Sequence, residues 1–325
     1  MAQLVKKIRT EAGDLQIDYN ALANLPTTDT TLAVSGKAAD AKIVGDAIND
    51  IHNDVNHMYA NFSNPNLLVN SDFRNPINQR GAQSYESKTS GKDTYNIDRW
   101  RASYGTITTV NDGSITVAGN TAANRYFYQT FEKYLSGTFT LSFNITNLQG
   151  NISMYYDANG AGTTINIPTG TTKMTFTATN LKSVGFFLPK TNGISATIKW
   201  VKLEVGSIAT PFVPRLYAEE LAICRRYYQN IDLHCLSGLV SDNGSKVTFA
   251  SSVYLRSTPS ITIKKAPESL RVDSTADVPT TLTYSSVYCH ENVCSVTFNS
   301  SATLGQRAVA WSIYEFTIAA DAEIY

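Results

Sequence analysis

Hydrophobic residues from position 41 to position 62 recur at alternating steps of three and four, and the residues between them are mostly polar. This spacing predicts a helix with one narrow apolar stripe, which is the heptad pattern of a coiled coil. A lone helix cannot bury such a stripe, and isoleucine at both core positions of the heptad favours three strands. An amphipathic helix that lies on its own domain is the alternative. We predict a homotrimer with the contact residues Val44, Ile48, Ile51, Val55, Met58 and Phe62.

The segments on either side of this helix set its limits. Residues 1–36 show no strong period and are expected to form an extended leader. Pro65 cannot continue a helix, and it also disfavours helical backbone in Asn64. The coiled coil is therefore predicted over residues 37–63.

Residues 64–214 carry the alternation of apolar and polar side chains that is typical of half-buried strands. Phe139, Leu141 and Phe143 alternate with threonine and serine, and Gly, Asn and Thr turns separate this run from other strand-like runs. Strands at such spacings predict a β-sandwich.

The remainder of the chain predicts a short helix and a second β domain. Leu221, Cys224 and Tyr228 recur at helical steps, so residues 215–229 are expected to form a connecting helix. Residues 230–325 return to alternation and predict a smaller β-sandwich. Its expected inward-facing residues are Val247, Phe249, Ile261, Ile263, Val296, Phe298, Val309, Trp311 and Ile313.

Two tryptophans are expected to be structural. Trp100 ends the segment Asp98-Arg99-Trp100, where we expect the ring to anchor the core and the aspartate to pair with the arginine. Trp200 continues the phase of Ile198 along its strand and is therefore also expected in the core.

The composition narrows the class of protein. Charged residues make up 17% of the chain, below the roughly 25% of an average protein, and the formal net charge is zero. Without a basic stripe to neutralise phosphates, nucleic-acid binding is not expected. The N-terminal residues lack the apolar core of a secretory signal, and no stretch is long and apolar enough to insert into a membrane. We expect synthesis in the cytoplasm and release by lysis.

The four cysteines are Cys224, Cys235, Cys289 and Cys294. Cys289 and Cys294 flank a predicted hairpin turn and would face each other in a non-hydrogen-bonded pair, where side chains approach most closely. Free thiols are expected in a protein that is assembled in the cytoplasm. A cross-strand disulfide and a zinc site with the two histidines His234 and His290 are the alternatives.

Aromatic residues out of phase with the apolar face of their strand are the candidates for ligand binding, because an aromatic ring stacks on the apolar face of a sugar ring. From residue 125 to residue 129, either Phe127 or its two tyrosine neighbours face outward. Each tyrosine alone is more often an ordinary surface or core residue, whereas the group indicates a binding face. The candidates in the first β domain are Tyr126, Tyr128 and Tyr155, with Tyr104 near a glycine turn. Comparable candidates in the second β domain are Tyr254, Arg256, Tyr284 and His290.

Catalytic and metal-binding motifs are missing from the sequence. It contains neither a G-x-S-x-G nucleophile elbow nor an H-E-x-x-H zinc helix. Acidic residues are scattered, so the carboxylate pair of a glycosidase cannot be identified. The segment Asp157–Gly162 lacks the glutamate of a calcium loop and predicts a hairpin. We expect no enzyme activity, no cofactor and no metal.

Several stretches resemble tail proteins of phages that infect Firmicutes. Residues 17–51 resemble the leader and coiled coil of tail fibre and minor tail proteins. NLLVNSDFRNPINQRG and YNIDRW within residues 66–100, with IKWVKLEVGSIATPFVPR at 198–215, resemble the two ends of a jelly-roll module similar to carbohydrate-binding domains. YAEELAICRRYYQ at 217–229 and YLRSTPSITI at 254–263 resemble the C-terminal domain that commonly follows.

This resemblance implies a mainly β, homotrimeric tail fibre or receptor-binding protein in the tail of a virion, synthesised in the cytoplasm of the host bacterium. The leader would attach to the tail or baseplate. The coiled coil would precede a jelly-roll module over residues 64–214 and a receptor-binding β-sandwich over residues 230–325. The expected function is noncovalent adhesion to host surface polysaccharide. A structural tail protein without ligand binding, a glycan depolymerase and a cellular adhesin are the alternatives.

Overall fold

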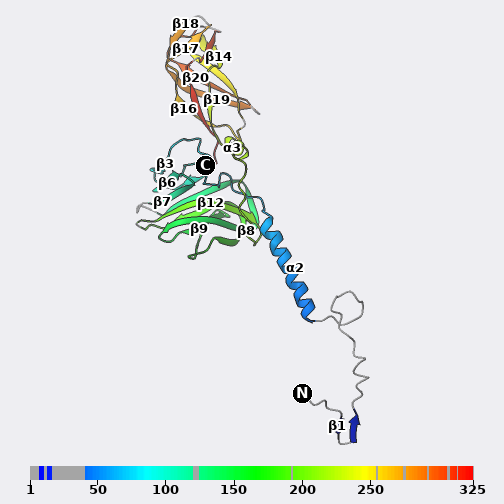
Figure 1. Cartoon of the computed structure of the whole chain (residues 1–325). Helices are drawn as coiled ribbons and strands as arrows, with labels where there is room; N and C mark the ends of the chain where they lie inside the picture. Colours follow the sequence, from blue (N-terminus) through cyan, green and yellow to red (C-terminus); the bar gives the residue numbers. More distant parts are fainter. Residues whose placement is uncertain are drawn as a thin grey trace. The chain divides into compact units, whose positions relative to one another are not determined.

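The fold, given by a computed structural model, is mainly β and is built from several antiparallel sheets. The structure describes residues 7–10, 13–16, 41–119, 124–191, 193–253, 255–273, 276–290, 293–305, 308–312 and 314–324. Contacts divide the chain into one unit of residues 1–63 and a larger unit of residues 64–325. Figure 1 shows the elements in their order along the chain.

The N-terminal unit contains a hairpin of β1 (Lys7–Thr10) and β2 (Gly13–Gln16), followed by the helix α2 (Ala41–Asn61). The predicted helix start at residues 37–40 lies outside the described residues. Within one chain the apolar stripe of α2 is exposed, with Ile51 at 64% and Met58 at 62% of full exposure. Among the described helices, none combines the length and apolar character needed to cross a bilayer.

The first β region, residues 64–214, forms one antiparallel sheet of ten strands. Its strands are β3 (Ser84–Glu86), β4 (Thr94–Tyr95), β5 (Arg101–Ala102), β6 (Thr106–Asn111), β7 (Ser114–Gly119), β8 (Arg125–Gln149), β9 (Ser153–Ala158), β10 (Ala161–Asn166), β11 (Lys173–Leu188) and β12 (Ser195–Val205). The main order is β10-β9-β11-β8-β12-β7-β6-β3, with β5 joining β4 to β8. The predicted hairpin at Asp157–Gly162 is confirmed, because β9 and β10 pair there.

Both halves of the 25-residue strand β8 contribute to a single core. Phe127 comes from its first half, whereas Phe139 and its alternating neighbours come from the second. Trp100 is fully buried and stacks on Phe127, with 4.9 Å between ring centres. Its indole N–H donates a hydrogen bond to the carbonyl oxygen of Asn70 at 2.8 Å. The expectation that Trp100 anchors the core is therefore confirmed.

Trp200 is not a core residue, contrary to the prediction. The register of β12 against β8 shifts between Ile198 and Trp200, so the alternation that buries Ile198 does not continue to the tryptophan. Trp200 is half-buried and stacks on Phe212, with 4.7 Å between ring centres and 7° between ring planes.

The second β region, residues 230–325, follows the helix α3 (Tyr217–Arg225). The predicted helix over residues 215–229 is shorter than expected, because Tyr228 already pairs with Asp321 in a sheet. One sheet has the order β13-β22-β16 and the other β18-β17-β21-β14-β15-β20-β19. The strands are β13 (Tyr228–Asp232), β14 (Ser237–Ser241), β15 (Lys246–Ser252), β16 (Ser260–Lys265), β17 (Ser269–Val272), β18 (Ala276–Pro279), β19 (Leu282–His290), β20 (Val293–Ser300), β21 (Val309–Trp311) and β22 (Thr317–Asp321), with the 3-10 turn η1 (Asp242–Gly244) after β14.

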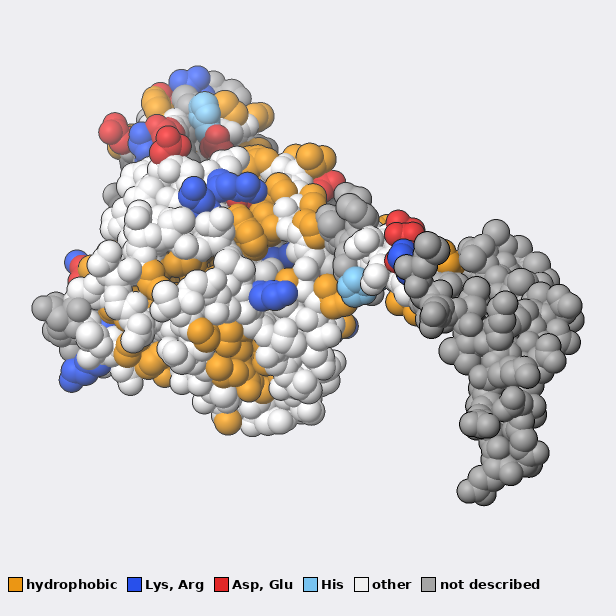
Figure 2. Space-filling view, turned by 60° about the horizontal axis from the view of Figure 1, so that its bottom comes forward, with side chains coloured by type: hydrophobic (Ala, Val, Ile, Leu, Met, Phe, Trp, Pro, Cys, Tyr) orange, Lys and Arg blue, Asp and Glu red, His pale blue; other side chains and the backbone are white. Residues whose placement is uncertain are grey.

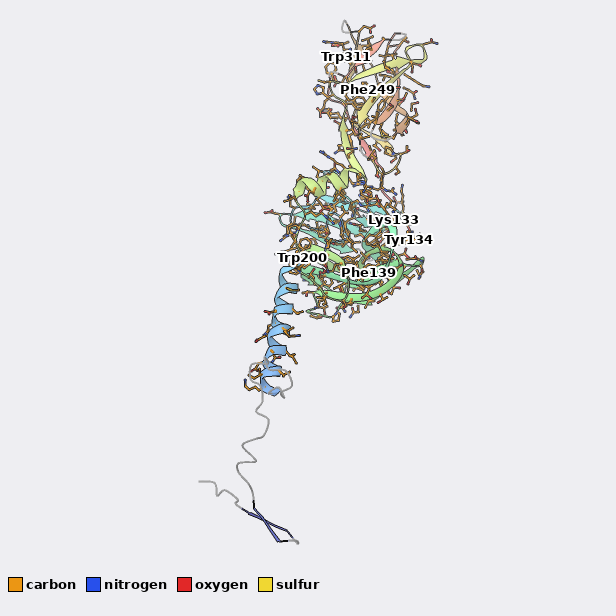
Figure 3. All side chains as sticks on the ribbon, turned by 90° about the vertical axis from the view of Figure 1, so that its right-hand side faces the viewer. Lys133, Tyr134, Phe139, Trp200, Phe249 and Trp311 are labelled. Carbon is orange, nitrogen blue, oxygen red and sulfur yellow. A yellow bond between two sulfur atoms is a disulfide. The ribbon has the colours of Figure 1, made fainter. Side chains whose placement is uncertain are left out.

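The core of the second β region is aromatic at its centre. Phe249 and Phe298 each meet Phe316 edge to face, at 5.6 and 5.2 Å between ring centres. Four residues expected to face inward are buried, namely Val247, Phe249, Val296 and Phe298, and Ile261 and Ile263 pack against this core. Figure 3 labels Phe249, together with Phe139 of the first β region.

The strand β21 has the phase opposite to the prediction. Ala310 is fully buried, whereas Trp311 is 38% exposed and Val309 is half-buried. The larger side chains therefore lie on the outer face, and the core takes the small alanine. Ile313 lies outside the described residues.

Cys289 and Cys294 form a disulfide, so the expectation of free thiols is wrong for this pair. They are direct partners in the register of β19 and β20, with 4.1 Å between their Cα atoms. Cys224 and Cys235 are free thiols, the first buried and the second exposed.

A buried network of charges joins the two β regions. Arg99 Nη1 lies 2.6 Å from Glu323 Oε2, and the Arg99 backbone N–H donates to the other oxygen of that carboxylate at 3.1 Å. The Arg99 guanidinium also lies 3.6 Å from the centre of the Tyr227 ring. Asp98 was expected to pair with its neighbour Arg99. It pairs instead with Arg80, at 3.1 Å. Residues more than two hundred positions apart are thus held together.

We predict that Glu323→Ala lowers the free energy of unfolding by about 3–5 kcal/mol, because it leaves the buried Arg99 guanidinium without its counter-ion. Urea unfolding followed by tryptophan fluorescence measures this loss. Glu315→Ala is the matched control, because Glu315 and Lys265 form an exposed pair, and its expected cost is below about 1 kcal/mol. Equal costs for the two variants would contradict the prediction.

Candidate ligand-binding site

The strands β8 and β9 each present tyrosines on the face opposite the core. Phe127 of β8 is fully buried, so Tyr126 and Tyr128 lie on the other face, which settles the alternative left open by the sequence. On β9, Met154 is buried and Tyr155 has the opposite phase, as predicted.

Gly185 of β11 allows these tyrosines to meet. It lies between the two strands, paired with Tyr128 on one side and Tyr155 on the other. A Cβ atom at this position would lie 2.2 Å from the carbonyl oxygen of Phe127, so only glycine permits the close approach of the backbones. The rings of Tyr128 and Tyr155 meet across the glycine at 5.6 Å, and Tyr126 lies 4.7 Å from Tyr155.

An open cavity of about 440 Å³ lies over these rings, and we call it the tyrosine cavity. Four residues predicted from sequence line it: Tyr104, Tyr126, Tyr128 and Tyr155. Its other lining residues are Ser90, Gly91, Asp93, Ser103, Asn124 and Gly162. This volume is within the range of small-molecule sites, and aromatic walls with a few polar groups are typical of them.

The polar groups of the cavity are ordered by hydrogen bonds. The Tyr128 hydroxyl donates to the carboxylate of Asp93. The Ser103 hydroxyl oxygen accepts from the backbone N–H of Tyr126 at 2.7 Å. Burial raises the pKa of Tyr155 to about 12 and also raises the pKa of Tyr128. Both phenols are therefore uncharged at neutral pH, and the proton of Tyr128 is already donated to Asp93.

Several residues of the site were not predicted. Asp93 and Ser103 come from loops on either side of β4 and β5, and no periodicity marks them. Gly185 carried a usable signal, because a glycine inside a strand often marks a close backbone approach.

The structure does not bring the candidates of the second β region into this cavity. Arg256 Nη1 donates to the carbonyl oxygen of Ala322 at 3.2 Å, and its Nε lies 3.6 Å from Glu132 of the first β region. Arg256 therefore holds the two β regions together. Tyr284 is 40% exposed on β19, and Tyr254 lies outside the described residues.

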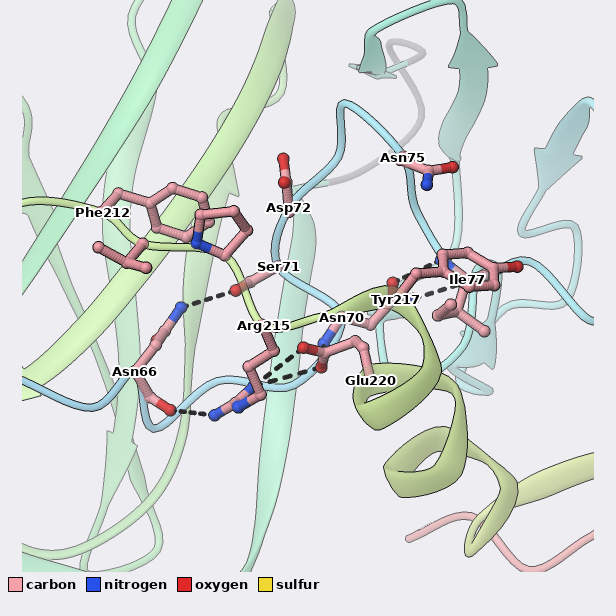
Figure 4. A pocket seen from close by; sticks show the side chains of 12 residues that line it. Asn66, Asn70, Ser71, Asp72, Asn75, Ile77, Phe212, Arg215, Tyr217 and Glu220 are labelled. Atoms are coloured by element: carbon pink, nitrogen blue, oxygen red, sulfur yellow. Dashed lines mark hydrogen bonds and ion pairs between the residues drawn. The ribbon is translucent and has the colours of Figure 1, made fainter.

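A smaller hollow of about 140 Å³ lies beside the start of α3, as Figure 4 shows. Arg215 donates to the carbonyl oxygen of Leu68 at 2.9 Å and pairs with Glu220 at 3.1 Å. Glu220 also accepts from the backbone N–H of Asn70. These polar groups bind one another, so we assign the hollow to the joint between α3 and the sheet.

Figure 2 shows one face of the molecule, on which white and orange areas are larger than the blue and red areas of charged side chains. No protein-family model matches the sequence, and no curated protein is significantly similar to it.

We predict that Gly185→Ala lowers the free energy of unfolding by about 1–3 kcal/mol, because the added methyl group forces β8 and β11 apart. Gly162→Ala is the control, since its Cβ would meet only the edge of the Tyr155 ring, at 3.1 Å. Urea unfolding of both variants measures the difference. A cost for Gly185→Ala no larger than that of the control would contradict the close approach.

Proposed function

We propose that this protein is a subunit of a homotrimeric phage tail appendage, and that it attaches noncovalently to host surface glycans through the tyrosine cavity. One observation carries the proposal. Four tyrosines named from the sequence, three of them for their phase along β8 or β9 and Tyr104 for its place near a glycine turn, line one open cavity together with hydroxyl, amide and carboxylate groups. Resemblance of the chain to phage tail proteins supports the biological setting.

The chemistry of the cavity suits a sugar. The ring faces of Tyr126 and Tyr155 can stack on the apolar face of a pyranose, and Asp93 and Asn124 can bind its hydroxyl groups. The ten-stranded sheet around a single core supports the interpretation of residues 64–214 as a jelly-roll, carbohydrate-binding-like module.

The exposed stripe of α2 supports the trimer. Phe62 is 72% exposed and Ile48 is 59% exposed in the single chain. Exposure of apolar side chains to water is unfavourable, and packing against two further copies would bury them. Three sites on one particle would also compensate for weak binding at each, since later contacts form at high effective concentration.

A depolymerase is the less favoured function. Among the ten described residues that line the tyrosine cavity, Asp93 is the only carboxylate, and it already accepts the Tyr128 hydroxyl. A glycosidase normally uses two carboxylates. Shortening of bound glycans is therefore monitored in the binding experiment.

We expect Tyr155→Ala to weaken binding to bacterial surface polysaccharides by about tenfold or more, because it removes a central stacking ring. A polysaccharide array with the full-length protein identifies a bound polysaccharide, and titration calorimetry gives its affinity. Tyr134→Ala is the matched control, since this tyrosine of β8, labelled in Figure 3, is 66% exposed and does not line the cavity. Unchanged binding by Tyr155→Ala would refute the site.

We expect Ile51→Asp to convert the trimer to monomers, because it places a carboxylate in the predicted apolar seam. Sedimentation equilibrium measures the mass. His52→Asp, on the neighbouring position outside the stripe, should remain a trimer. A monomeric native protein would contradict the oligomeric part of the proposal and leave the tyrosine cavity unaffected.

A further inference from the structure

A series of contacts between aromatic rings and guanidinium groups begins at the tyrosine cavity and ends in the second β region. Successive groups lie between 3.9 and 5.6 Å apart. In order, this Tyr–Arg ladder consists of Tyr155, Tyr128, Arg101, Tyr95, Arg80 and Tyr228. Such cation–π contacts are attractive. The ladder is therefore a continuous series of contacts from one β region to the other.

A second cavity of about 540 Å³ lies along this ladder, and we call it the junction cavity. Lys92, Asp93 and Tyr95 of the first β region line one side of it, and Ser260 and Asp321 of the second β region line the other. Neither β region could form this cavity alone.

The two cavities adjoin at Asp93, which lines both. Its carboxylate accepts the hydroxyl of Tyr128, a residue of the tyrosine cavity. Arg101 contacts a ring of each cavity, with its guanidinium carbon 5.5 Å from the ring centre of Tyr128 and 5.6 Å from that of Tyr95. One ring of this contact lines each cavity.

Hydrogen bonds across the junction fix the walls of the second cavity. Gln79 donates to the carbonyl oxygen of Tyr228 at 2.6 Å, and Asn230 donates to the carbonyl oxygen of Gln79 at 2.7 Å. The Tyr95 hydroxyl donates to the carbonyl oxygen of Ile324. Both cavities are therefore preformed relative to each other, which lowers the entropic cost of binding a ligand across them.

The charged residues that line the two cavities are equal in number for each sign. Arg80 and Lys92 are the cations, and Asp93 and Asp321 are the carboxylates. An anionic or cationic ligand gains no net attraction from this set, whereas the hydroxyl groups of a neutral sugar find both donors and acceptors.

We propose that the tyrosine cavity and the junction cavity form one groove for an extended, uncharged oligosaccharide, with the second β region contributing Ser260 and Asp321 to its far half. This inference rests on the proposed glycan-binding function and adds three properties to it: the length of the ligand, its lack of charge and the participation of both β regions.

Ser260→Trp tests the groove, because Ser260 is exposed at the edge strand β16 and a large ring there would fill the junction cavity. Ser237→Trp is the matched control, since Ser237 is also an exposed strand serine of the second β region and lines neither cavity. The probes are the disaccharide and octasaccharide fractions from partial hydrolysis of each neutral polysaccharide that the native protein binds on the array. Calorimetry with the full-length protein compares the native chain, both serine variants and Tyr155→Ala.

We expect the native protein and Ser237→Trp to bind the octasaccharide about tenfold more tightly than the disaccharide. Ser260→Trp should bind both probes with the affinity that the native protein has for the disaccharide, and Tyr155→Ala should bind both probes about tenfold or more weakly than the native protein does. If Ser260→Trp keeps the preference for the longer probe while Tyr155→Ala shows this weakening, the extended groove is refuted and the glycan-binding function stands. If Tyr155→Ala binds as the native protein does, both the proposed glycan site and the extended groove are refuted. Tighter binding of an acidic polysaccharide than of any neutral one would refute the uncharged ligand.

Discussion

The buried ion pair between Arg99 and Glu323 is the interaction on which the arrangement of the two β regions depends. Removing both charges from water costs several kcal/mol for each ion, so the pair needs the further hydrogen bonds that its other groups make. Glu323 receives both the guanidinium and the backbone N–H of Arg99, and Arg99 donates further to the carbonyl oxygen of Thr130 at 2.7 Å. Arg99 also adopts a left-handed backbone conformation, with φ of 71°, which turns its N–H and side chain toward the same carboxylate.

The tyrosine cavity depends on a different constraint, which is the absence of a side chain at Gly185. Two aromatic residues on strands that are not adjacent normally have a third side chain between them. Here the glycine of the intervening strand lets Tyr128 and Tyr155 touch, and the resulting contact begins the Tyr–Arg ladder. The binding surface is therefore held by packing within the sheet, and its rings need little reorganisation to receive a ligand.

The alternation of apolar and polar residues correctly predicted which face of a strand several side chains occupy. The phase of each strand placed Phe139 and Phe249 in cores and Tyr155 outside one, because alternation along a strand requires no knowledge of its partners. Prediction failed where a neighbour changes the phase. A register shift turns Trp200 out of the core, and β21 buries Ala310 in place of Trp311.

The cavities could not be predicted for a similar reason. Asp93 reaches the tyrosines only through the fold of its loop, and the junction cavity requires Lys92 and Ser260 to meet from opposite β regions. These residues come together only through contacts between distant parts of the chain. The contact of Arg99 with Glu323 is an example, since the two residues are 224 positions apart in the sequence. For Asp93, Lys92 and Ser260 the sequence therefore contains no local signal that they lie near one another or near the tyrosines.

The disulfide of β19 and β20 has a consequence for the order of events in folding. Its cysteines are only five positions apart, so closing this short loop removes little entropy from the unfolded chain, worth about 2 kcal/mol. Strand pairing brings Cys289 and Cys294 opposite each other before any covalent bond is needed. The register of the hairpin can therefore position the two thiols for oxidation. A chain that folds in a reducing compartment can reach its native pairing first and acquire the crosslink later, on exposure to an oxidising environment.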